Sequence, residues 1–155
     1  MRERLIKFLA TGFGAGYSPV APGTAGSLVG IAFWWALNQQ HHLWLRAVLM
    51  VLAIVFAVWC AGEASDILHH PDPPSVVIDE IVAMPLVLIG VGTSWWHVAL
   101  GFAMFRIFDV WKPTPVREAQ DFSGGIGIVL DDLLAAAYAC LATHGVVWLV
   151  AWMKH

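Results

Sequence analysis

The stretch Arg106-Ile-Phe-Asp-Val-Trp-Lys-Pro-Thr-Pro115 ends an apolar segment of this chain and begins a polar loop. Arg106 and Asp109 are three residues apart, so on a helix their side chains would share one face. The two prolines that follow end the helix, because proline lacks an amide donor and clashes with the preceding turn. Only 12% of the residues are charged. Two cations and a carboxylate grouped here, with Lys112 as the second cation, therefore indicate either a binding site or a charge pair capping a membrane span.

The composition is that of an integral membrane protein. Hydrophobic residues make up 59% of the 155 residues, compared with roughly 45–50% in soluble proteins, and the mean hydropathy is +0.73. The length fits one domain, residues 1–155. A net charge of −3 gives no reason to expect nucleic acid as a partner. Cys60 and Cys140 lie in apolar segments and are expected to be free thiols, and the N-terminus does not have the pattern of a removable signal peptide.

Apolar segments alternate with polar ones and predict an all-α membrane bundle of about four to five apolar helices. A short amphipathic helix at residues 2–11 is expected to lie at the membrane interface. The apolar segments are 27–37 (extending back to about 23), 43–62, 81–91, 95–108 and 128–153. The third and fourth are shorter than the ~20 residues that cross hydrocarbon, and they are predicted to form a helical hairpin inside the bundle. Thr24 or Ser27 could cap the first helix.

Charged residues are unevenly divided between the two ends of these segments. With the N-terminus inside, the inner side holds Arg2, Arg4, Lys7, Arg106, Lys112 and Arg117, whereas the outer side holds Arg46 and Lys154. The positive-inside rule then makes the inner side the cytoplasm of a multi-pass protein. All eleven acidic residues fall on the same side. Acidic residues contribute little to orientation, so their segregation needs another cause.

Five carboxylates lie at the inner ends of apolar segments, and they are the predicted metal ligands. They are Asp79, Glu80, Asp109, Asp131 and Asp132. If they converge they repel one another unless cations join them, and a divalent metal would serve beside Arg106 and Lys112. Hard oxygen ligands favour Mg²⁺, which commonly binds one or two carboxylates together with a substrate phosphate.

Several groups near these carboxylates could bind a phosphate. Arg106 and Lys112 can bind phosphate oxygens, arginine in a bidentate manner. Helix N-termini bind anions, and two helices are predicted to begin at glycine-rich loops: one contains Thr24 and Ser27, and the other Gly124 and Gly125. Each signal is weak alone, because such loops are more often ordinary turns and the Asp131–Asp132 pair could simply favour the helix dipole. Together they predict a phosphate at the inner membrane surface, such as the head of a lipid.

Other polar residues on the inner side have no assigned role at this stage. Glu63 follows an apolar segment directly, and Asp66 and Asp72 come shortly after it. His69 and His70 could bind zinc with either aspartate, but two histidines in a loop are usually solvated.

Four blocks of this sequence resemble the phosphatidylglycerophosphatase A family in order and spacing. They are Gly23–Ser27, Asp72 with Val77–Glu80, Phe105–Pro115 and Gly124–Asp132. The resemblance covers nearly the whole chain. It implies an enzyme of the bacterial inner membrane that uses Mg²⁺ to remove the terminal phosphate of phosphatidylglycerophosphate, giving phosphatidylglycerol.

The resemblance also implies roles for individual residues. The five carboxylates would form the catalytic and metal-binding set on the cytoplasmic face, and Arg106 and Lys112 would hold the phosphate. It leaves open whether an aspartate or a water molecule attacks the phosphorus. One departure is Ala83, where a glycine is expected after the Asp–Glu pair; we expect it to affect helix packing more than chemistry.

Three other readings compete with a lipid phosphatase that uses a metal. A small transporter or channel subunit with an acidic cation site should also place ionisable groups at mid-membrane or on the far side. A helical scaffold subunit would use the charges as structural pairs. A metal-independent lipid phosphatase would carry a Ser-Gly-His block, which this sequence lacks. No obligatory protein partner is evident.

Overall fold

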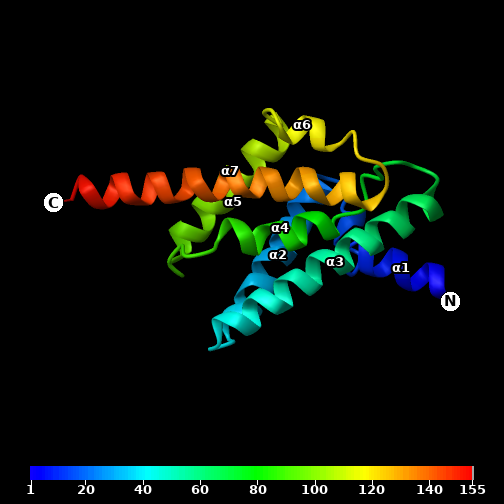
Figure 1. Cartoon of the computed structure of the whole chain (residues 1–155), viewed down its shortest axis with the longest axis horizontal. Helices are drawn as coiled ribbons and strands as arrows, with labels where there is room; N and C mark the ends of the chain where they lie inside the picture. Colours follow the sequence, from blue (N-terminus) through cyan, green and yellow to red (C-terminus); the bar gives the residue numbers. More distant parts are fainter. Residues whose placement is uncertain (155) are drawn as a thin grey trace.

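The computed structural model describes residues 1–154, and within that range the chain forms helices and no strands (Figure 1). The elements are α1 (Arg2–Ala10), the 3-10 helix η1 (Ala15–Tyr17), α2 (Pro22–Asn38), α3 (Leu43–Leu68), α4 (Ile78–Val87), α5 (Trp95–Trp111), α6 (Val116–Ala119) and α7 (Gly125–Trp152). The five apolar helices α2, α3, α4, α5 and α7 correspond to the five apolar segments, so the all-α prediction is confirmed.

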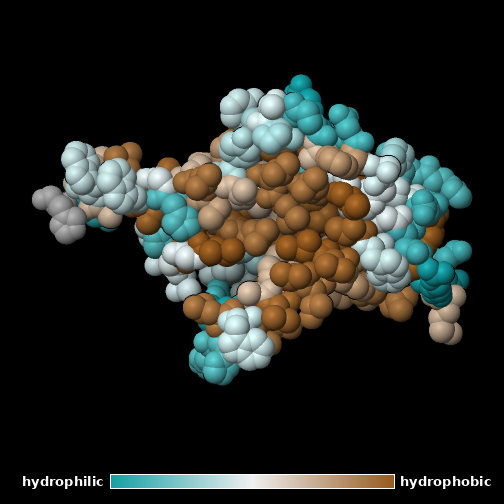
Figure 2. Space-filling model, viewed as in Figure 1, coloured by the Kyte–Doolittle hydropathy of each residue, from teal (hydrophilic) through white to brown (hydrophobic). Residues whose placement is uncertain are grey.

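Two of these helices, α3 and α7, are long and apolar enough to cross a membrane. Only 17% of the apolar window of α3 and 22% of that of α7 is buried in the protein, which differs from the core helices of a soluble protein. The helices α2 and α5 have 17 residues each, at the lower limit of roughly 17–25 for a span. Figure 2 shows a broad hydrophobic area across the middle of one face, with hydrophilic residues toward its edges. This surface is that of a membrane-associated protein.

The short helix α4 lies at the centre of the bundle, where eight of its ten residues are buried. It packs mainly against α2 and α7. Gly26 and Gly30 of α2 allow the close contact, because a Cβ at Gly26 would lie 2.6 Å from Val77 Cβ and one at Gly30 would lie 2.7 Å from Met84 Cβ. Small residues four apart bring membrane helices together in this way. The structure thus differs from the predicted hairpin, since α5 packs chiefly along α7 rather than along α4.

The start of α2 also differs from the prediction. The helix begins at Pro22, preceded by Ala21, which carries no side-chain oxygen that could act as a cap. Proline suits the first helical position because its missing N–H would have no partner there. Ser27 lies inside the helix instead, and its hydroxyl donates to the carbonyl of Gly23 at 2.8 Å. The prediction that Thr24 or Ser27 caps this helix is therefore wrong.

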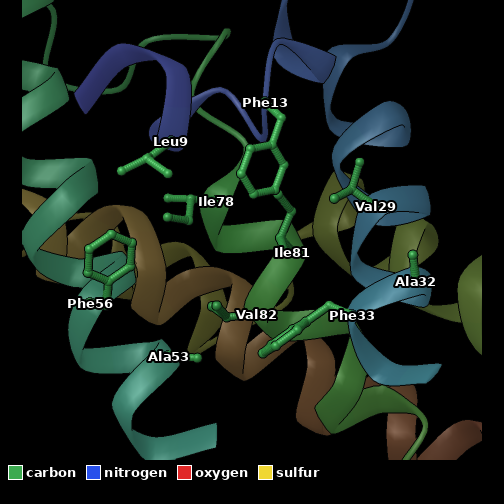
Figure 3. Close-up of a pocket in the computed structure, with 10 residues that line it drawn as sticks. All are labelled: Leu9, Phe13, Val29, Ala32, Phe33, Ala53, Phe56, Ile78, Ile81 and Val82. Carbon is green, nitrogen blue, oxygen red and sulfur yellow. The ribbon is translucent and has the colours of Figure 1, made fainter. Parts of the chain in front are cut away.

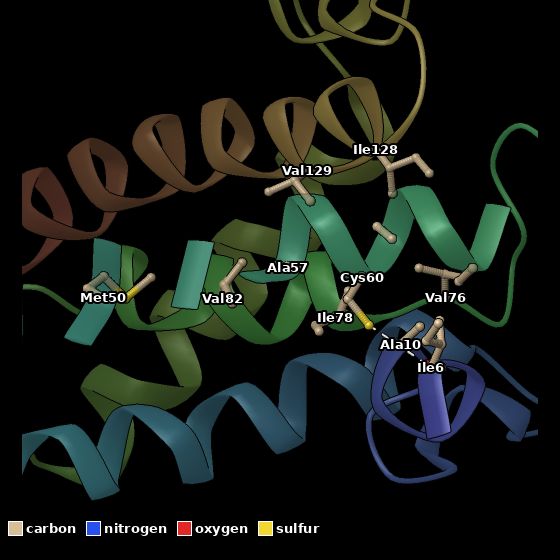
Figure 4. Packing of buried hydrophobic residues seen from close by; sticks show 12 residues of the cluster. Ile6, Ala10, Met50, Ala57, Cys60, Val76, Ile78, Val82, Ile128 and Val129 are labelled. Atoms are coloured by element: carbon tan, nitrogen blue, oxygen red, sulfur yellow. Dashed lines mark hydrogen bonds between the residues drawn. The ribbon is translucent and has the colours of Figure 1, made fainter. Parts of the chain in front are cut away.

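Two clusters of buried apolar residues hold the bundle together, and α4 contributes to both. The first joins α1, α3, α4 and α7 (Figure 4). Within it the Cys60 thiol of α3 faces the Ile6 carbonyl of α1 at 3.8 Å, which fixes the N-terminal helix to the bundle. The second surrounds Phe105 and Met84, both fully buried, between α4, α5 and α7. Both cysteines are free thiols, as predicted.

Candidate active site

Three carboxylates from two helices converge beside the first turn of α4. Asp79 and Glu80 begin α4, and Asp132 faces them from α7; one oxygen of each lies within 4.8 Å of the others. Asp79 Oδ1, Glu80 Oε2 and Asp132 Oδ2 are buried and have no hydrogen-bond partner within residues 1–154. We call these three residues the carboxylate triad.

The carboxylate triad fits a divalent cation. Buried oxygens without partners are costly, and three carboxylates at this separation repel one another unless a positive charge lies among them. The donors are all hard oxygens, which is the ligand set that Mg²⁺ takes in proteins. Within the described part of the chain no second group of three such side chains converges, so the zinc alternative at His69 and His70 gains no support.

The other two predicted carboxylates are ion-paired. Asp109 Oδ2 lies 2.8 Å from Arg106 Nη1 on the same face of α5, as the spacing of three residues predicts. Asp131 Oδ2 accepts a hydrogen bond from Lys112 Nζ at 2.6 Å, and its Oδ1 accepts the Asp132 N–H at 3.0 Å. All five carboxylates thus gather in one region, but in two groups with different partners.

Arg106 and Lys112 are the more exposed members of these two ion pairs. Arg106 Nη1 is also 3.9 Å from Glu80 Oε1, so it bridges Asp109 and the carboxylate triad. The two side chains are 23% and 24% exposed, which leaves donors available to an incoming anion. Burial alone would lower the pKa of Lys112, but its hydrogen bond and charge pair with Asp131, together with nearby Asp109 and Asp132, raise that pKa above its ordinary value. Lys112 is therefore a cation throughout the physiological range.

Gly23, in the first turn of α2, touches this site and was not singled out from the sequence. A Cβ at Gly23 would collide with Glu80 Oε1 and would lie 2.9 Å from Arg106 Nη1. The signal was present in the block Gly23–Ser27, which we interpreted as an anion-binding loop through Thr24 and Ser27. In the structure Thr24 is half-buried in the first turn of α2, and Ser27 is fully buried with its hydroxyl bound to the helix backbone.

The two glycines at the N-terminus of α7 have different surroundings: Gly125 packs against α3, whereas Gly124 is exposed beside a cavity. A Cβ at Gly125 would collide with the Val58 carbonyl of α3 and would lie 2.7 Å from the Gly62 nitrogen. Gly124, exposed and with φ of 68°, borders a cavity of about 280 Å³ that Asp72 also lines. The predicted phosphate-binding glycines thus lie near Asp72 rather than in the carboxylate triad.

The remaining acidic residues near this end of the bundle lie outside the triad. Glu63 pairs with Arg2 of α1 at 2.7 Å, and Asp66 is exposed on α3.

Known proteins resemble this chain over most of its length. The family model described as phosphatidylglycerophosphatase A matches residues 8–147, which include all four blocks named above and every residue of the site. No solved structure gives a significant match.

Curated relatives cover most of the chain. A Bacteroides thetaiotaomicron protein named "Putative phosphatidylinositol-3-phosphatase" is 39% identical over 92% of this chain and 93% of its own length. An Escherichia coli protein named phosphatidylglycerophosphatase A is 42% identical over 82% of this chain and 74% of its own length. A Haemophilus influenzae protein of the same name is 36% identical over 91% of this chain and 88% of its own length. The match of the family model to residues 8–147 and these two relatives show that this chain belongs to the phosphatidylglycerophosphatase A family.

Proposed function

We propose that this chain is a Mg²⁺-dependent phosphatase that hydrolyses the terminal phosphomonoester of phosphatidylglycerophosphate and releases phosphatidylglycerol and phosphate. The observation that carries the proposal is the carboxylate triad, with three buried oxygens that have no hydrogen-bond partner among residues 1–154, beside two cations that remain partly exposed. The family match supplies the substrate class.

In this proposal one set of residues binds the metal and another set binds the phosphate. Asp79, Glu80 and Asp132 would hold Mg²⁺, which when bound acts as a Lewis acid on a phosphoryl oxygen. Arg106 and Lys112 would bind the other phosphoryl oxygens and neutralise their charge.

Asp109 and Asp131 would act through the two cations. Their ion pairs, at 2.8 and 2.6 Å, fix where the guanidinium and the ammonium stand before the substrate arrives. Cations held in place in advance need little reorganisation during the reaction, which is how fixed charges contribute most to catalysis.

The proposed membrane location is supported by the distribution of charged residues. A lipid substrate brings its phosphate to the membrane surface, and in the topology predicted from the sequence the site residues fall on the side that holds the acidic residues and most of the basic ones. We propose a multi-pass protein of the bacterial inner membrane with this end in the cytoplasm. A transporter or channel gains no support from the family match or from the relatives.

A second lipid phosphomonoester is the alternative substrate. The Bacteroides relative, which covers more of this chain than the Escherichia coli protein does, carries the name of a phosphatidylinositol-3-phosphatase. The carboxylate triad and the two cations would contact the phosphate of either lipid in the same way, so the choice depends on the part of the headgroup beyond the phosphate.

The test is release of inorganic phosphate from each lipid by the purified protein in detergent micelles, with Mg²⁺ and with EDTA. We expect Mg²⁺-dependent release from phosphatidylglycerophosphate, its loss in EDTA, and its loss in Asp79→Asn. The exposed Asp121→Asn should behave as wild type. Full activity in EDTA would exclude the metal, and faster release from phosphatidylinositol 3-phosphate would replace the proposed substrate.

A further inference from the structure

A polar cavity lies at the start of α7, close to the ion pair of Lys112 and Asp131. Its volume is about 280 Å³, and it is lined by Pro71 and Asp72 of the loop after α3, by residues 120–124, and by Gly127 and Ile128 of α7. The two loops lie at the same end of the bundle (Figure 1). Gly127 and Ile128 precede Asp131 by four and three residues, so they share one face of α7 with it. The cavity is therefore about one helical turn, roughly 5.4 Å, from the cations of the site.

The loop that carries Asp72 is held by the end of α3. The Ser65 hydroxyl donates to the His70 carbonyl at 2.7 Å and lies 3.3 Å from the Pro71 carbonyl oxygen. The Asp72 N–H donates to His70 Nδ1 at 3.2 Å. These bonds fix the backbone on which the Asp72 side chain stands, although Asp72 itself is exposed. The cavity thus has a carboxylate acceptor at a defined place.

The charges around this cavity select the kind of group that it can take. The carboxylate of Asp72 is close enough to Asp131 for their negative charges to repel each other. A second anionic group, such as the phosphodiester of a lipid, would be repelled there as well. A hydroxyl group is neutral and donates a strong hydrogen bond to an ionised acceptor. The cavity therefore suits a hydroxyl that is attached to the phosphate-bearing part of a substrate.

Both lipids considered above carry such a hydroxyl. In phosphatidylglycerophosphate and in phosphatidylinositol 3-phosphate, the carbon next to the phosphorylated one bears a free hydroxyl group. With the phosphate at Arg106 and Lys112, this hydroxyl is the first polar group of the headgroup that can extend along α7 toward Asp72.

We propose that Asp72 recognises the substrate by accepting a hydrogen bond from the hydroxyl next to the phosphoester carbon, and that the cavity at the start of α7 admits this part of the headgroup. The inference rests on the proposed phosphatase function and deepens it. Asp72 is then a substrate-binding residue, and Ser65, which acts through the loop, is a positioning residue. Asp121, from the other loop of the cavity, is assigned no contact.

The experiment removes the hydroxyl from the substrate and the acceptor from the protein. Phosphate release by the full chain in detergent micelles with Mg²⁺ is measured for phosphatidylglycerophosphate and for an analogue in which 1,3-propanediol replaces the headgroup glycerol, so that only the hydroxyl is missing. Wild type should prefer the hydroxylated lipid in kcat/KM roughly 10–100-fold, as expected for a hydrogen bond to a charged group. Asp72→Ala should lose this preference and leave kcat/KM for the analogue unchanged, and Asp72→Asn, which keeps an oxygen acceptor, should retain part of it.

Two further variants separate recognition from general effects. Ser65→Ala should raise KM for the hydroxylated lipid and leave KM for the analogue unchanged, whereas equal losses with both lipids would remove Ser65 from the proposal. Asp121→Asn should keep the wild-type preference. A loss as large as that in Asp72→Ala would show that the total charge of the cavity matters, and would overturn the assignment of Asp72.

Failure of this inference can be distinguished from failure of the proposed function. A wild type that releases no phosphate from phosphatidylglycerophosphate, from its analogue or from phosphatidylinositol 3-phosphate would overturn the phosphatase proposal and this inference with it. An active wild type with equal kcat/KM for the first two lipids would overturn the Asp72 contact alone. If phosphatidylinositol 3-phosphate is the better substrate, Asp72→Ala should lower its kcat/KM by the same factor, and an unchanged value would overturn the contact.

Discussion

The carboxylate triad brings buried carboxylate oxygens of Asp79, Glu80 and Asp132 close together. This arrangement lowers the stability of the metal-free protein, but it provides the metal ligands that activity requires. Without a cation the three carboxylates repel one another, and their buried oxygens lack hydrogen-bond partners within residues 1–154. With a cation the same oxygens become ligands. The region thus stores unfavourable energy that ligand binding relieves, a common arrangement at functional sites.

Asp132→Asn should separate these two effects. In EDTA we expect the variant to unfold at the same temperature as wild type or higher, because one buried charge has been removed. In Mg²⁺ at about 100 times its dissociation constant, wild type should gain about 2.7 kcal/mol, and the variant should lose that gain together with its activity. Thermal unfolding in detergent and phosphate release measure the two outcomes.

The control for Asp132→Asn is Asp66→Asn, on the exposed surface of α3. It should keep both the activity and the shift of the unfolding temperature that Mg²⁺ causes. A wild-type protein whose unfolding temperature does not respond to Mg²⁺ would contradict the assignment of the triad as a metal site.

Gly23→Ala tests whether the close approach of α2 holds Glu80 and Arg106 in the positions that activity requires. The added methyl group would push Glu80 and Arg106 away from α2. We expect kcat/KM to fall roughly 10–100-fold, the usual effect of disturbing the groups that orient metal ligands, with little change in unfolding temperature. Gly145→Ala is the matched control, because its Cβ would meet no described atom within 4 Å. If Gly23→Ala keeps the kcat/KM of wild type, the close approach of Gly23 to Glu80 and Arg106 does not position the site.

At this scale the sequence predicted which residues gather but not how they pair. Charges at the inner ends of apolar segments identified Asp79, Asp109 and Asp131 as neighbours. The division into a triad and two ion pairs depends on side-chain directions across three helices, and no spacing within one segment encodes these. The Arg106–Asp109 pair is the exception, since both residues lie on one helix.

At the scale of helices, glycines decide which elements pack together. Gly26 and Gly30 seat α4 on α2, and Gly125 seats α7 on α3 near Gly62. The sequence placed the helices correctly because apolar segments mark them. The predicted partner of α4 was wrong. Two short apolar segments joined by a short connection favour a hairpin of α4 with α5. The actual contact with α2 depends on the spacing of Gly26 and Gly30, which the prediction did not use.

Gly125→Ala tests whether the start of α7 is a packing contact. Backbone atoms of α3 stand where the Cβ would be placed, so the two helices must separate. Such overpacking costs about 1–3 kcal/mol, which thermal unfolding in detergent should detect. If Gly125 served mainly to bind the phosphate, KM would rise while the unfolding temperature stayed the same. Gly145→Ala in the same helix is again the control, and it should be neutral or slightly stabilising.

At the scale of the whole molecule, the proposed orientation makes a prediction about labelling. In a background of Cys60→Ala and Cys140→Ala, the exposed position His41 lies in the turn between α2 and α3, and the exposed Ser123 lies just before α7. A membrane-impermeant maleimide should label His41→Cys in intact spheroplasts. Ser123→Cys should react only after the membrane is permeabilised. Labelling of Ser123→Cys from outside would reverse the orientation and place the site on the outer face.

The central helix α4 constrains how related sequences can diverge in length. Its consecutive residues have different surroundings: Asp79 and Glu80 belong to the carboxylate triad, while Ile78 and Ile81 line an apolar pocket between α2 and α3 (Figure 3). Inserting or deleting one residue between positions 78 and 87 would rotate the part of the helix beyond it by about 100° relative to the part before it, and the buried side chains of α4 would no longer meet their present neighbours. Gaps in an alignment of natural variants should therefore fall in the connecting loops and leave this decapeptide at constant length.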